Sequence, residues 1–322
     1  MRFDFRSSFA VKLKTFIEQK QALGRSYDCF GRYLARFDAM CAESYPAATK
    51  LTQEICMKWA VKSPTENNNS FRDRMSAVRE FARFLVRNGE SAYIIPVNLV
   101  KKSPRYMPYI YTKEEIADVW KAFDDLNPSN NSKARHIVLP AIVRLLYCCG
   151  LRPAETRRLV VSDVDLSKGR LFIRESKGHK DRIVMMSADV VEYMEGYESK
   201  IRAFFPKREY FFPSPHGVSS CSSWLKNNWL PIRRKLNFSP VCGNLPRLYD
   251  FRHTFATHRL YEWMQEGKDL DTMLPYLSAY MGHAQLSDTY YYMHLVPGQL
   301  KALSGIDFTR YENLLPEVEH NE

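Results

Sequence analysis

Three side chains near the C-terminal end of the sequence could together hold a phosphodiester and attack it. Arg252 lies in an otherwise apolar helical segment, and Tyr292 follows His283 by nine residues. A guanidinium offers phosphate oxygens a planar, permanently charged fork. A tyrosine hydroxyl acts as a covalent nucleophile when its neighbours activate it. Phosphoryl transfer needs more than this set, because a second arginine and a proton donor must come from elsewhere in the chain.

Both missing groups are present upstream. Arg152 occupies a Gly-Leu-Arg-Pro corner just past a predicted helix, and Glu155, three residues on, could steer its guanidinium. Lys177 lies in a predicted hairpin turn, from which a flexible side chain could protonate a leaving alkoxide. Lys180 lies in the same turn and is a rival for that role. Two arginines, one lysine and one tyrosine form a set in which fixed cations carry the charge that metals would otherwise neutralise.

Each of these residues also has a plainer interpretation. Arg152 alone would be read as a capping or salt-bridge partner of Glu155, and Lys177 as a solvated turn residue. His283 could be a packed histidine at a helix start, and the run of tyrosines at 290–292 an aromatic helix surface. Chemistry alone does not choose among those tyrosines, whereas the step of nine residues from His283 selects Tyr292.

Four other histidines lack partners at metal-ligand spacing, so we interpret them as structural or DNA-facing. They are His179, His216, His258 and His294.

Helices are predicted for most of residues 7–95. Apolar residues recur at helical spacing over 9–23, 26–41 and 71–88, and a shorter helix is expected after Thr52. The third of these segments carries arginines on the surface left by its apolar stripe, namely Arg72, Arg74, Arg79, Arg83 and Arg87. Singly they are solvated charges. As a set they predict a contact surface for a DNA backbone, with Arg72, Arg79 and Arg83 as the candidates.

A proline-rich stretch without periodicity, 95–108, separates this unit from a second one. We therefore expect a helical domain over 1–102, a linker at 103–108 and a catalytic domain over 109–322 with a tail from about 295. Thr112 and Glu115 form a capping-box signature that starts the second domain. A helix over 134–149 and a hairpin of strands 170–174 and 182–186 follow, so the domain is predicted to be mainly helical with a small antiparallel sheet.

Composition narrows the class of protein. The 322 residues are 45% apolar, which excludes wholesale disorder, and carry a formal charge of +11, which indicates a polyanionic partner such as nucleic acid. The count of seven cysteines is odd and includes no CxxC pair, as expected for thiols in a reducing cytosol. The N-terminus lacks a signal-peptide core, and the richest apolar run, 137–149, is too short to span a bilayer.

Five short boxes resemble the signatures of the tyrosine recombinase (phage integrase) family, in family order and spacing over roughly 110–295. They are Gly150–Glu155, Ser176–Arg182, Phe251–Thr257, Met281–His283 and Tyr292–His294. Each box is weak alone, and together they are highly specific. The helical unit that precedes them is similar to the family's core-binding domain at the level of fold.

The resemblance implies a fold and a mechanism. Two domains would form a clamp around duplex DNA, and Arg152 and Arg252 would grip the scissile phosphate. Lys177 would be the general acid for the 5′-hydroxyl, and His283 would hydrogen-bond the phosphate. Tyr292 would form a 3′-phosphotyrosyl bond, so that rejoining needs neither a nucleotide nor any cofactor or metal.

One position departs from the family pattern. The family usually has a histidine three residues before the second arginine, where this chain has Tyr249. A phenol donates hydrogen bonds but is a poor base near neutral pH, since its reference pKa is ~10. The replacement of histidine by Tyr249 affects the step in which a proton is accepted more than the binding of the phosphate. His253, next to Arg252, matches a family position that is usually structural.

The sequence is therefore interpreted as a site-specific DNA recombinase that integrates or excises a mobile element or phage. The family implies double-stranded recombination sites as substrate and a homotetramer on DNA, with accessory DNA-bending proteins. A cytoplasmic, nucleoid-associated protein with no membrane contact is expected. Two alternatives remain open: a type IB topoisomerase-like nicking-closing enzyme, and a DNA-binding regulator whose catalysis has lapsed because of Tyr249.

Overall fold

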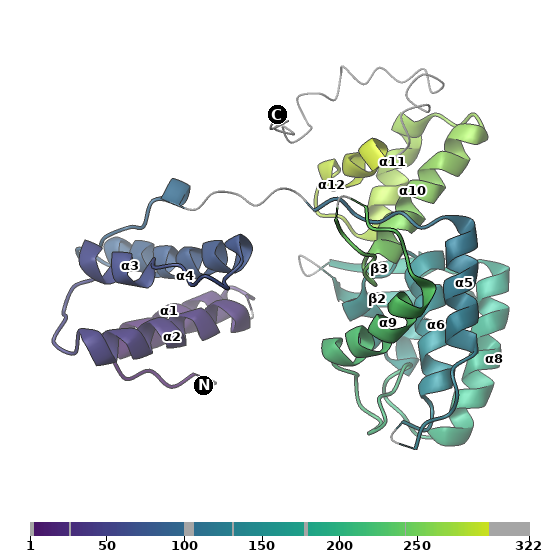
Figure 1. The fold of residues 1–322 in the computed structure, drawn as a ribbon, viewed down its shortest axis with the longest axis horizontal. Helices are drawn as coiled ribbons and strands as arrows, with labels where there is room; N and C mark the ends of the chain where they lie inside the picture. Colours follow the sequence, from purple (N-terminus) through teal and green to yellow (C-terminus); the bar gives the residue numbers. More distant parts are fainter. Residues whose placement is uncertain are drawn as a thin grey trace. The chain divides into compact units, whose positions relative to one another are not determined.

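A computed structural model describes residues 3–25, 27–99, 106–130, 132–176, 180–241 and 243–295. At positions 175, 176, 180, 294 and 295 it describes the backbone alone. The chain divides into two compact units, Met1–Tyr106 and Met107–Glu322 (Figure 1). Each unit has its own apolar core and is considered by itself.

The first unit is built from helices, as its apolar spacing predicts. They are α1 (Ala10–Ala22), α2 (Asp28–Ser44), α3 (Gln53–Trp59), α4 (Asn68–Arg87) and a short 3-10 turn, η1 (Val97–Leu99). Helices α1 and α2 both pack against α4. Phe16, Phe37 and Phe81 are among the buried side chains between them. Thr52 and Asn67 cap α3 and α4, because the side chain of each accepts a hydrogen bond from a first-turn amide.

Two arginines of α4 are buried, which corrects the prediction that they lie on its surface. Arg74 is 5% exposed, pairs with Glu66 at 2.8 Å and lies over the ring of Trp59. Arg79 is 6% exposed and donates to the backbone carbonyls of Ile95 and Pro96, at 2.6 and 3.0 Å. Both guanidiniums satisfy carbonyls or a carboxylate inside the unit, so Arg79 is not available to a DNA backbone.

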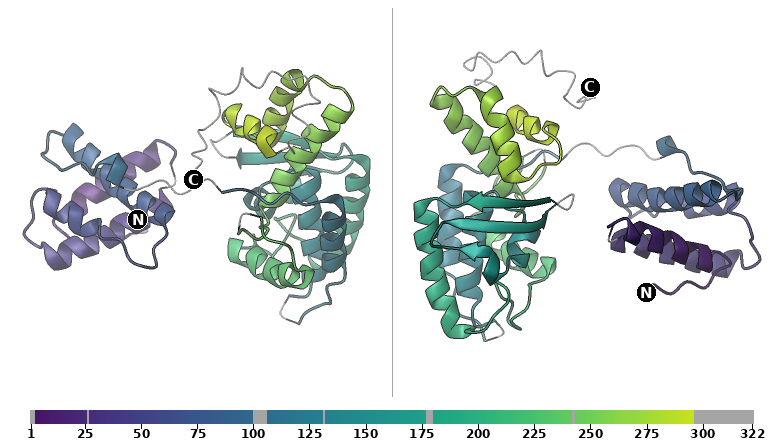
Figure 2. Two further views of the ribbon diagram at one scale, coloured as in Figure 1. Left: turned by 45° about the horizontal axis from the view of Figure 1, so that its top comes forward. Right: turned by 180° about the vertical axis from the view of Figure 1, so that it is seen from behind.

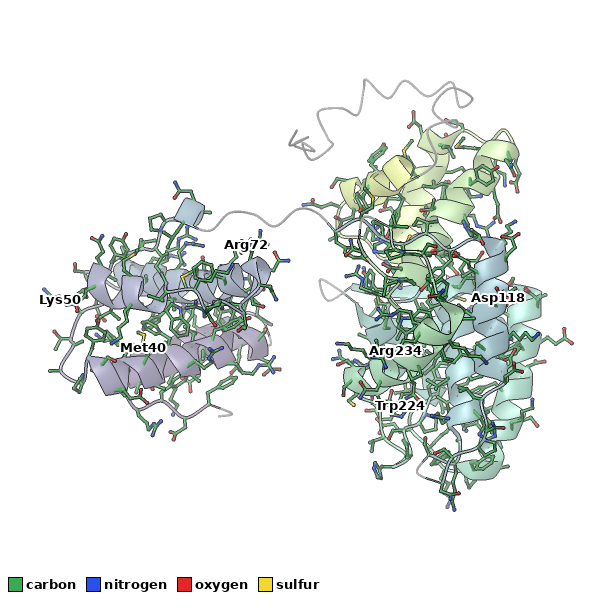
Figure 3. All side chains as sticks on the ribbon, in the orientation of Figure 1. Met40, Lys50, Arg72, Asp118, Trp224 and Arg234 are labelled. Carbon is green, nitrogen blue, oxygen red and sulfur yellow. The ribbon has the colours of Figure 1, made fainter. Side chains whose placement is uncertain are left out.

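The other two DNA-contact candidates on α4 lie nearer to solvent. Arg72 is exposed and projects from the helix in Figure 3. Arg83 is partly exposed and pairs with Glu80 at 2.6 Å, one turn back along the helix. An i,i+3 pair on a surface contributes little to stability, so it leaves Arg83 free to exchange its partner.

The second unit is mainly helical, with one small sheet among the described residues. Its first half comprises α5 (Lys113–Asp124), α6 (Arg135–Cys148), α7 (Pro153–Arg158), η2 (Val161–Asp163), β1 (Val164–Asp165), β2 (Arg170–Ser176) and β3 (Lys180–Met185). Its second half comprises α8 (Ala188–Phe204), α9 (Ser222–Leu236), α10 (Asp250–Gln265), α11 (Leu270–Met281), α12 (Ser287–Tyr290) and η3 (Tyr291–Leu295).

The sheet has the order β1-β2-β3 and is antiparallel throughout. The right-hand view of Figure 2 shows β2 and β3 crossing one face of the unit beneath α10, α11 and α12. The predicted hairpin is therefore present, with Leu171 paired to Val184 and Phe172 to Ile183. The capping box that starts α5 is also present, because Thr112 and Glu115 exchange hydrogen bonds of 3.1 and 2.9 Å.

Helix α6 is the centre of the core and contacts α5, α8 and α10. Its residues Val138–Val143, Leu145 and Leu146 are buried, as expected for a helix that is apolar around most of its circumference. A second cluster joins α10, α11 and η3, and includes Phe255, Leu274 and Tyr292. Among the described helices, none combines the length and apolar character that a bilayer crossing requires.

Candidate active site

The first site arginine is positioned where α6 ends. Gly150 adopts φ +58°, and a Cβ there would meet the ring of Phe255 at 2.4 Å, so the tight turn requires glycine. Arg152 is the N-cap of α7 and Pro153 occupies the first helical position, where proline is well tolerated. The backbone amide of Arg152 donates to Glu155 Oε2 at 2.8 Å. The turn and the cap together direct the Arg152 side chain away from the core.

The Arg152 guanidinium has two anchors. Its NH1 donates to Glu155 Oε1 at 2.6 Å, and its NH2 donates to the Gly282 carbonyl at 3.1 Å. A guanidinium has five N–H donors, so these two bonds leave several for a ligand. Residue 282 is next to His283, so the second anchor joins Arg152 to another candidate site residue. The expectation that Glu155 steers Arg152 agrees with this geometry.

Arg252 lies at the centre of the site and is 0% exposed. Its NH1 donates to the Gly150 carbonyl and its NH2 to the Met281 carbonyl, both at 2.6 Å. Those carbonyls belong to the turns that precede Arg152 and His283. Burial, with the nearby charge of Arg152, lowers the pKa of Arg252 to about 10, which still leaves it protonated at pH 7. Within the described residues its Nε–H has no hydrogen-bond partner.

His283 follows Gly282, the C-cap residue that ends α11 in a left-handed conformation. Gly282 has φ +66°, and the His283 amide closes the turn on the Ser278 carbonyl at 3.0 Å. The imidazole Nδ1 lies 2.7 Å from Thr289 Oγ1, and the ring stacks on Tyr292 at 5.9 Å between centroids. Burial, reinforced by the charges of Arg252, Arg152 and Arg182, lowers the pKa of His283 to about 3. The imidazole is therefore neutral near pH 7.

Tyr292 is 3% exposed and lies on η3, against α10. Burial raises the pKa of its hydroxyl to about 12, although a hydrogen bond and the charge of Arg252 act in the opposite direction. The stacking contact with His283, and the charge of Arg252 acting on the Tyr292 hydroxyl, place this tyrosine inside the site. Tyr290, on α12, is buried in the same apolar cluster as Tyr292. Of the two, Tyr292 is the one whose ring stacks on His283.

Tyr249 lies at the N-terminal end of α10, one turn before Arg252, and is 37% exposed. Burial acts to lower the pKa of Arg152, but Glu155 and, less strongly, the Tyr249 hydroxyl raise it. Its ring lies 5.1 Å from that of His253, which in turn lies 5.6 Å from that of Tyr292. The residue that replaces the usual histidine therefore faces the site rather than the core.

The predicted general acid falls between the end of β2 and the start of β3 in the sequence. Lys177 lies outside the described residues, and so does the side chain of Lys180. The backbones of both strands are described, and Ser176 pairs with Lys180 at their ends. No cluster of three or more His, Cys, Asp or Glu side chains in the described ranges is arranged to hold a metal ion.

Sequence reasoning missed two residues that touch the site. Arg182 on β3 makes a two-bond pair with Glu155, and Thr289 contacts His283. A signal was available for Arg182, because it ends the Ser176–Arg182 box. Thr289 had none, since a threonine six residues past a histidine belongs to none of the five boxes.

A cavity of about 470 Å³ adjoins the site between α7 and β2. Its lining includes Arg152, Arg158 and Arg174. Arg174 is held in place by Asp163, at 2.7 Å, and lies over the ring of Phe172. The hollow next to Arg152 is therefore bordered by guanidinium groups, as a polyanion would require.

Comparison with known proteins agrees with this fold. The model of the phage integrase family matches residues 112–298, which span α5 to η3. The chain belongs to the phage integrase family, the tyrosine recombinases, whose members are enzymes that cleave and rejoin DNA.

Named relatives are similar over most of the chain. Tyrosine recombinase XerD of Staphylococcus aureus (strain Mu50 / ATCC 700699) is 30% identical over 240 residues, which are 71% of this chain and 72% of XerD. A relative named as an integrase/recombinase, y4rB of Sinorhizobium fredii (strain NBRC 101917 / NGR234), is 29% identical over 302 residues, 92% of this chain and 95% of its own.

Among solved structures, the XerH site-specific recombinase in a post-cleavage complex with palindromic difH has TM-score 0.64 at 18% identity. That match covers 93% of this chain and 84% of XerH. The Tn1549 transposon integrase in complex with transposon right end DNA has TM-score 0.63 at 12% identity, over 93% of this chain and 98% of the integrase. At these identities the likeness shows a shared fold.

Proposed function

We propose that this enzyme is a site-specific recombinase that serves a mobile element or an integrated phage. It cleaves one strand of duplex DNA with Tyr292, conserves the bond energy as a 3′-phosphotyrosine and rejoins the end to a second strand. The observation that carries the proposal is the position of Arg252. It is fully buried between the carbonyls of Gly150 and Met281, and its charge lowers the pKa of the Tyr292 hydroxyl against the opposing effect of burial. A buried guanidinium with a spare donor beside a phenol is suited to holding a phosphate in line for attack.

The two arginines would bind the non-bridging oxygens. Arg252 retains its Nε–H, and Arg152 retains the donors that Glu155 and Gly282 do not use. Hydrogen bonds to the protein hold both guanidiniums in place, so little reorganisation is needed when charge develops on the phosphate oxygens.

His283 would donate a hydrogen bond to the same phosphate. Its Nδ1 is occupied by Thr289, so Nε2 is the atom left to face a ligand. Because the pKa of His283 is lowered to about 3, the ring would act as a neutral donor and not as a cation. A neutral donor adds orientation and leaves the charge at the site to the arginines.

The covalent step forms one bond and breaks one. The Tyr292 oxygen bonds to phosphorus, the bond to the 5′-oxygen breaks, and Lys177 supplies the proton that the departing oxygen needs. The phenolic proton of Tyr292 passes to water or to a phosphate oxygen, since position 249 carries a hydrogen-bond donor, a tyrosine, in place of the family's usual histidine. Rejoining reverses these steps with the 5′-hydroxyl of another strand.

The first unit would contact duplex DNA as a core-binding domain. Its candidate contact residues are Arg72 and Arg83, and the net charge of +11 supports a polyanionic partner. XerH and the Tn1549 integrase, which share the fold, are in complex with DNA in their solved structures. We further propose a homotetramer on two sites, in which residues after 295 dock on a neighbouring protomer, with accessory DNA-bending proteins.

A covalent-adduct assay tests the proposal. DNA flanking the coding region is made into nicked suicide duplexes, and the trapped protein–DNA adduct is separated under denaturing conditions. We expect the wild-type enzyme to form adduct and Tyr292→Phe to bind the same DNA without forming it. Tyr290→Phe removes the hydroxyl of a neighbouring tyrosine on α12, so it is the matched control and should form adduct normally.

Two results would redirect the assignment. Binding by the wild-type protein with no adduct on any flanking duplex would favour a DNA-binding regulator whose catalysis has lapsed. Nicking and closing of a single circular duplex, with no exchange between two sites, would favour a topoisomerase-like enzyme.

A further inference from the structure

Arg182 on β3 uses each of its three guanidinium nitrogens in a hydrogen bond next to the site. Its NH1 and NH2 donate to Glu155 Oε1 and Oε2, each at 2.9 Å, and its Nε donates to the Tyr280 carbonyl at 2.9 Å. The side chains of Arg182 and Glu155 are only 8% and 7% exposed. A buried, two-bond pair of this kind is geometrically strict, because both groups are planar.

Glu155 is shared between Arg182 and Arg152. Oε1 accepts from Arg182 NH1 and from Arg152 NH1, and Oε2 accepts from Arg182 NH2 and from the Arg152 amide. A carboxylate has about four lone-pair sites, so this one is saturated. Burial would raise the pKa of Glu155, but the hydrogen bonds and charge of Arg182, followed by those of Arg152, lower it to about 2. The Glu155 carboxylate is therefore charged, and Arg182 interacts with it more strongly than Arg152 does.

Arg182 also touches the second anchor of Arg152. A Cβ built on Gly282 would meet Arg182 Cδ at 2.9 Å and its Nε at 3.1 Å, so this turn lies directly against the Arg182 side chain. The Gly282 carbonyl is the one that accepts from Arg152 NH2. Both groups that orient Arg152 are therefore in contact with Arg182.

We propose that Arg182 is a positioning residue that keeps the charge of Arg152 available to the scissile phosphate. Arg182 donates to both Glu155 oxygens, so the Arg152 guanidinium bonds only one of them, Oε1. The remaining N–H groups of Arg152 can then bind phosphate. Without Arg182, Glu155 would be free to turn onto Arg152, bind it through both oxygens and neutralise it. Arg152, Arg182 and Glu155 together carry a charge of +1, whereas Arg152 and Glu155 without Arg182 carry none. The inference rests on the proposed function, because it assigns Arg152 to the phosphate.

The test compares a variant that should lose cleavage activity with a double variant that should recover part of it. Arg182→Met should bind DNA nearly as well as the wild type but cleave a suicide substrate more slowly, by roughly the 10²–10³ expected for losing one transition-state contact. Adding Glu155→Gln should restore a measurable part of that rate, because it removes the charge that captures Arg152. A merely structural role predicts the opposite, since the double variant would lose two packed partners. Arg170→Met, which breaks the exposed Arg170–Asp165 pair on β2, is the matched control and should cleave normally.

Each outcome decides something. A normal rate for Arg182→Met, or a double variant no faster than Arg182→Met, would overturn the inference while wild-type adduct still supports the recombinase. If the wild type formed no adduct, the proposed function would fail and the catalytic part of this inference with it. The free energies of unfolding of the two single variants and the double variant would then test the pairing itself, and strict additivity would refute it.

Discussion

Thr289 Oγ1 lies 2.7 Å from Nδ1 of His283, and the threonine is completely buried. The contact joins α12 to the turn that ends α11, so it determines which edge of the imidazole faces Arg252. Because the hydroxyl can donate to Nδ1, it can keep the proton of the neutral ring on Nε2, where a phosphate oxygen would accept it.

Replacing Thr289 with valine should therefore slow DNA cleavage, because it keeps the side-chain shape and removes the hydroxyl. An unsatisfied buried Nδ1 should also cost about 1–3 kcal/mol of folding free energy. Single-turnover cleavage and chemical denaturation measure the two effects. Thr289→Ser keeps the hydroxyl and should retain most of the rate. Equal rates for valine and serine would show that the contact does not orient His283 for catalysis.

Tyr249 should assist cleavage without being essential. Its hydroxyl is one of the groups, after Glu155, that raise the pKa of Arg152 against the effect of burial, so Tyr249→Phe should reduce the single-turnover rate by at most ~10²–10³. Tyr249→His, which restores the usual family residue, should be tolerated or faster. Rates measured from pH 6 to 9 would show whether an imidazole titration appears in the second variant. Complete loss of cleavage in Tyr249→Phe with DNA binding intact would make the phenol essential, contrary to this prediction.

As the pH falls, the catalytic unit should lose stability in two steps. The first, at higher pH, comes from His283, and the second, at lower pH, comes from Glu155. The pKa of His283 is about 3 in the folded protein, below its unfolded value of ~6.5, so the folded state binds fewer protons between those values. Its contribution to stability is present above pH ~6.5 and is lost as the pH falls toward 3, by at most about 1.4 kcal/mol for each pH unit. Glu155, with a pKa of about 2, adds a second loss that begins only below its unfolded value of ~4.3.

Denaturant unfolding of the wild type and of His283→Gln at pH 7, 6 and 5 measures this effect. The glutamine variant should show the smaller decrease over that range, since it has no imidazole to titrate. Parallel curves for the two proteins would show that His283 keeps an ordinary pKa in the folded state.

Two arginines of α4 should behave differently although they are seven residues apart on one helix. Arg72→Ala should leave the free energy of unfolding within about 0.5 kcal/mol, weaken DNA binding and reduce the slope of log affinity against log salt by about 1. Arg79→Ala should instead destabilise the first unit, by about 1–3 kcal/mol for each backbone carbonyl of residues 95 and 96 that it leaves unsatisfied. Salt titrations and denaturation curves measure both. A stable Arg79→Ala protein with a reduced salt slope would reverse these assignments.

Local patterns in the sequence were sufficient for the elements and for most of the candidate site. Helical periodicity predicted α1, α2 and α4, the capping box located the start of α5, and the alternating segments predicted the β2–β3 hairpin. The order and spacing of the five boxes were enough to indicate the family. These predictions succeed because helix caps, turns and side-chain periodicity depend on residues only a few positions apart.

Contacts between distant segments were decided only by the tertiary structure. Nothing near Arg79 in the sequence shows that the carbonyls of Ile95 and Pro96 come within reach of its guanidinium, so a surface position was the wrong prediction. Arg182 and Glu155 are 27 residues apart, and they meet because β3 packs beside α7 and the end of α11. The sequence by itself determined which groups could do chemistry. Long-range packing decided which of these groups form ion pairs. A buried charge is stable only when it is paired, and its partner can come from a distant part of the sequence.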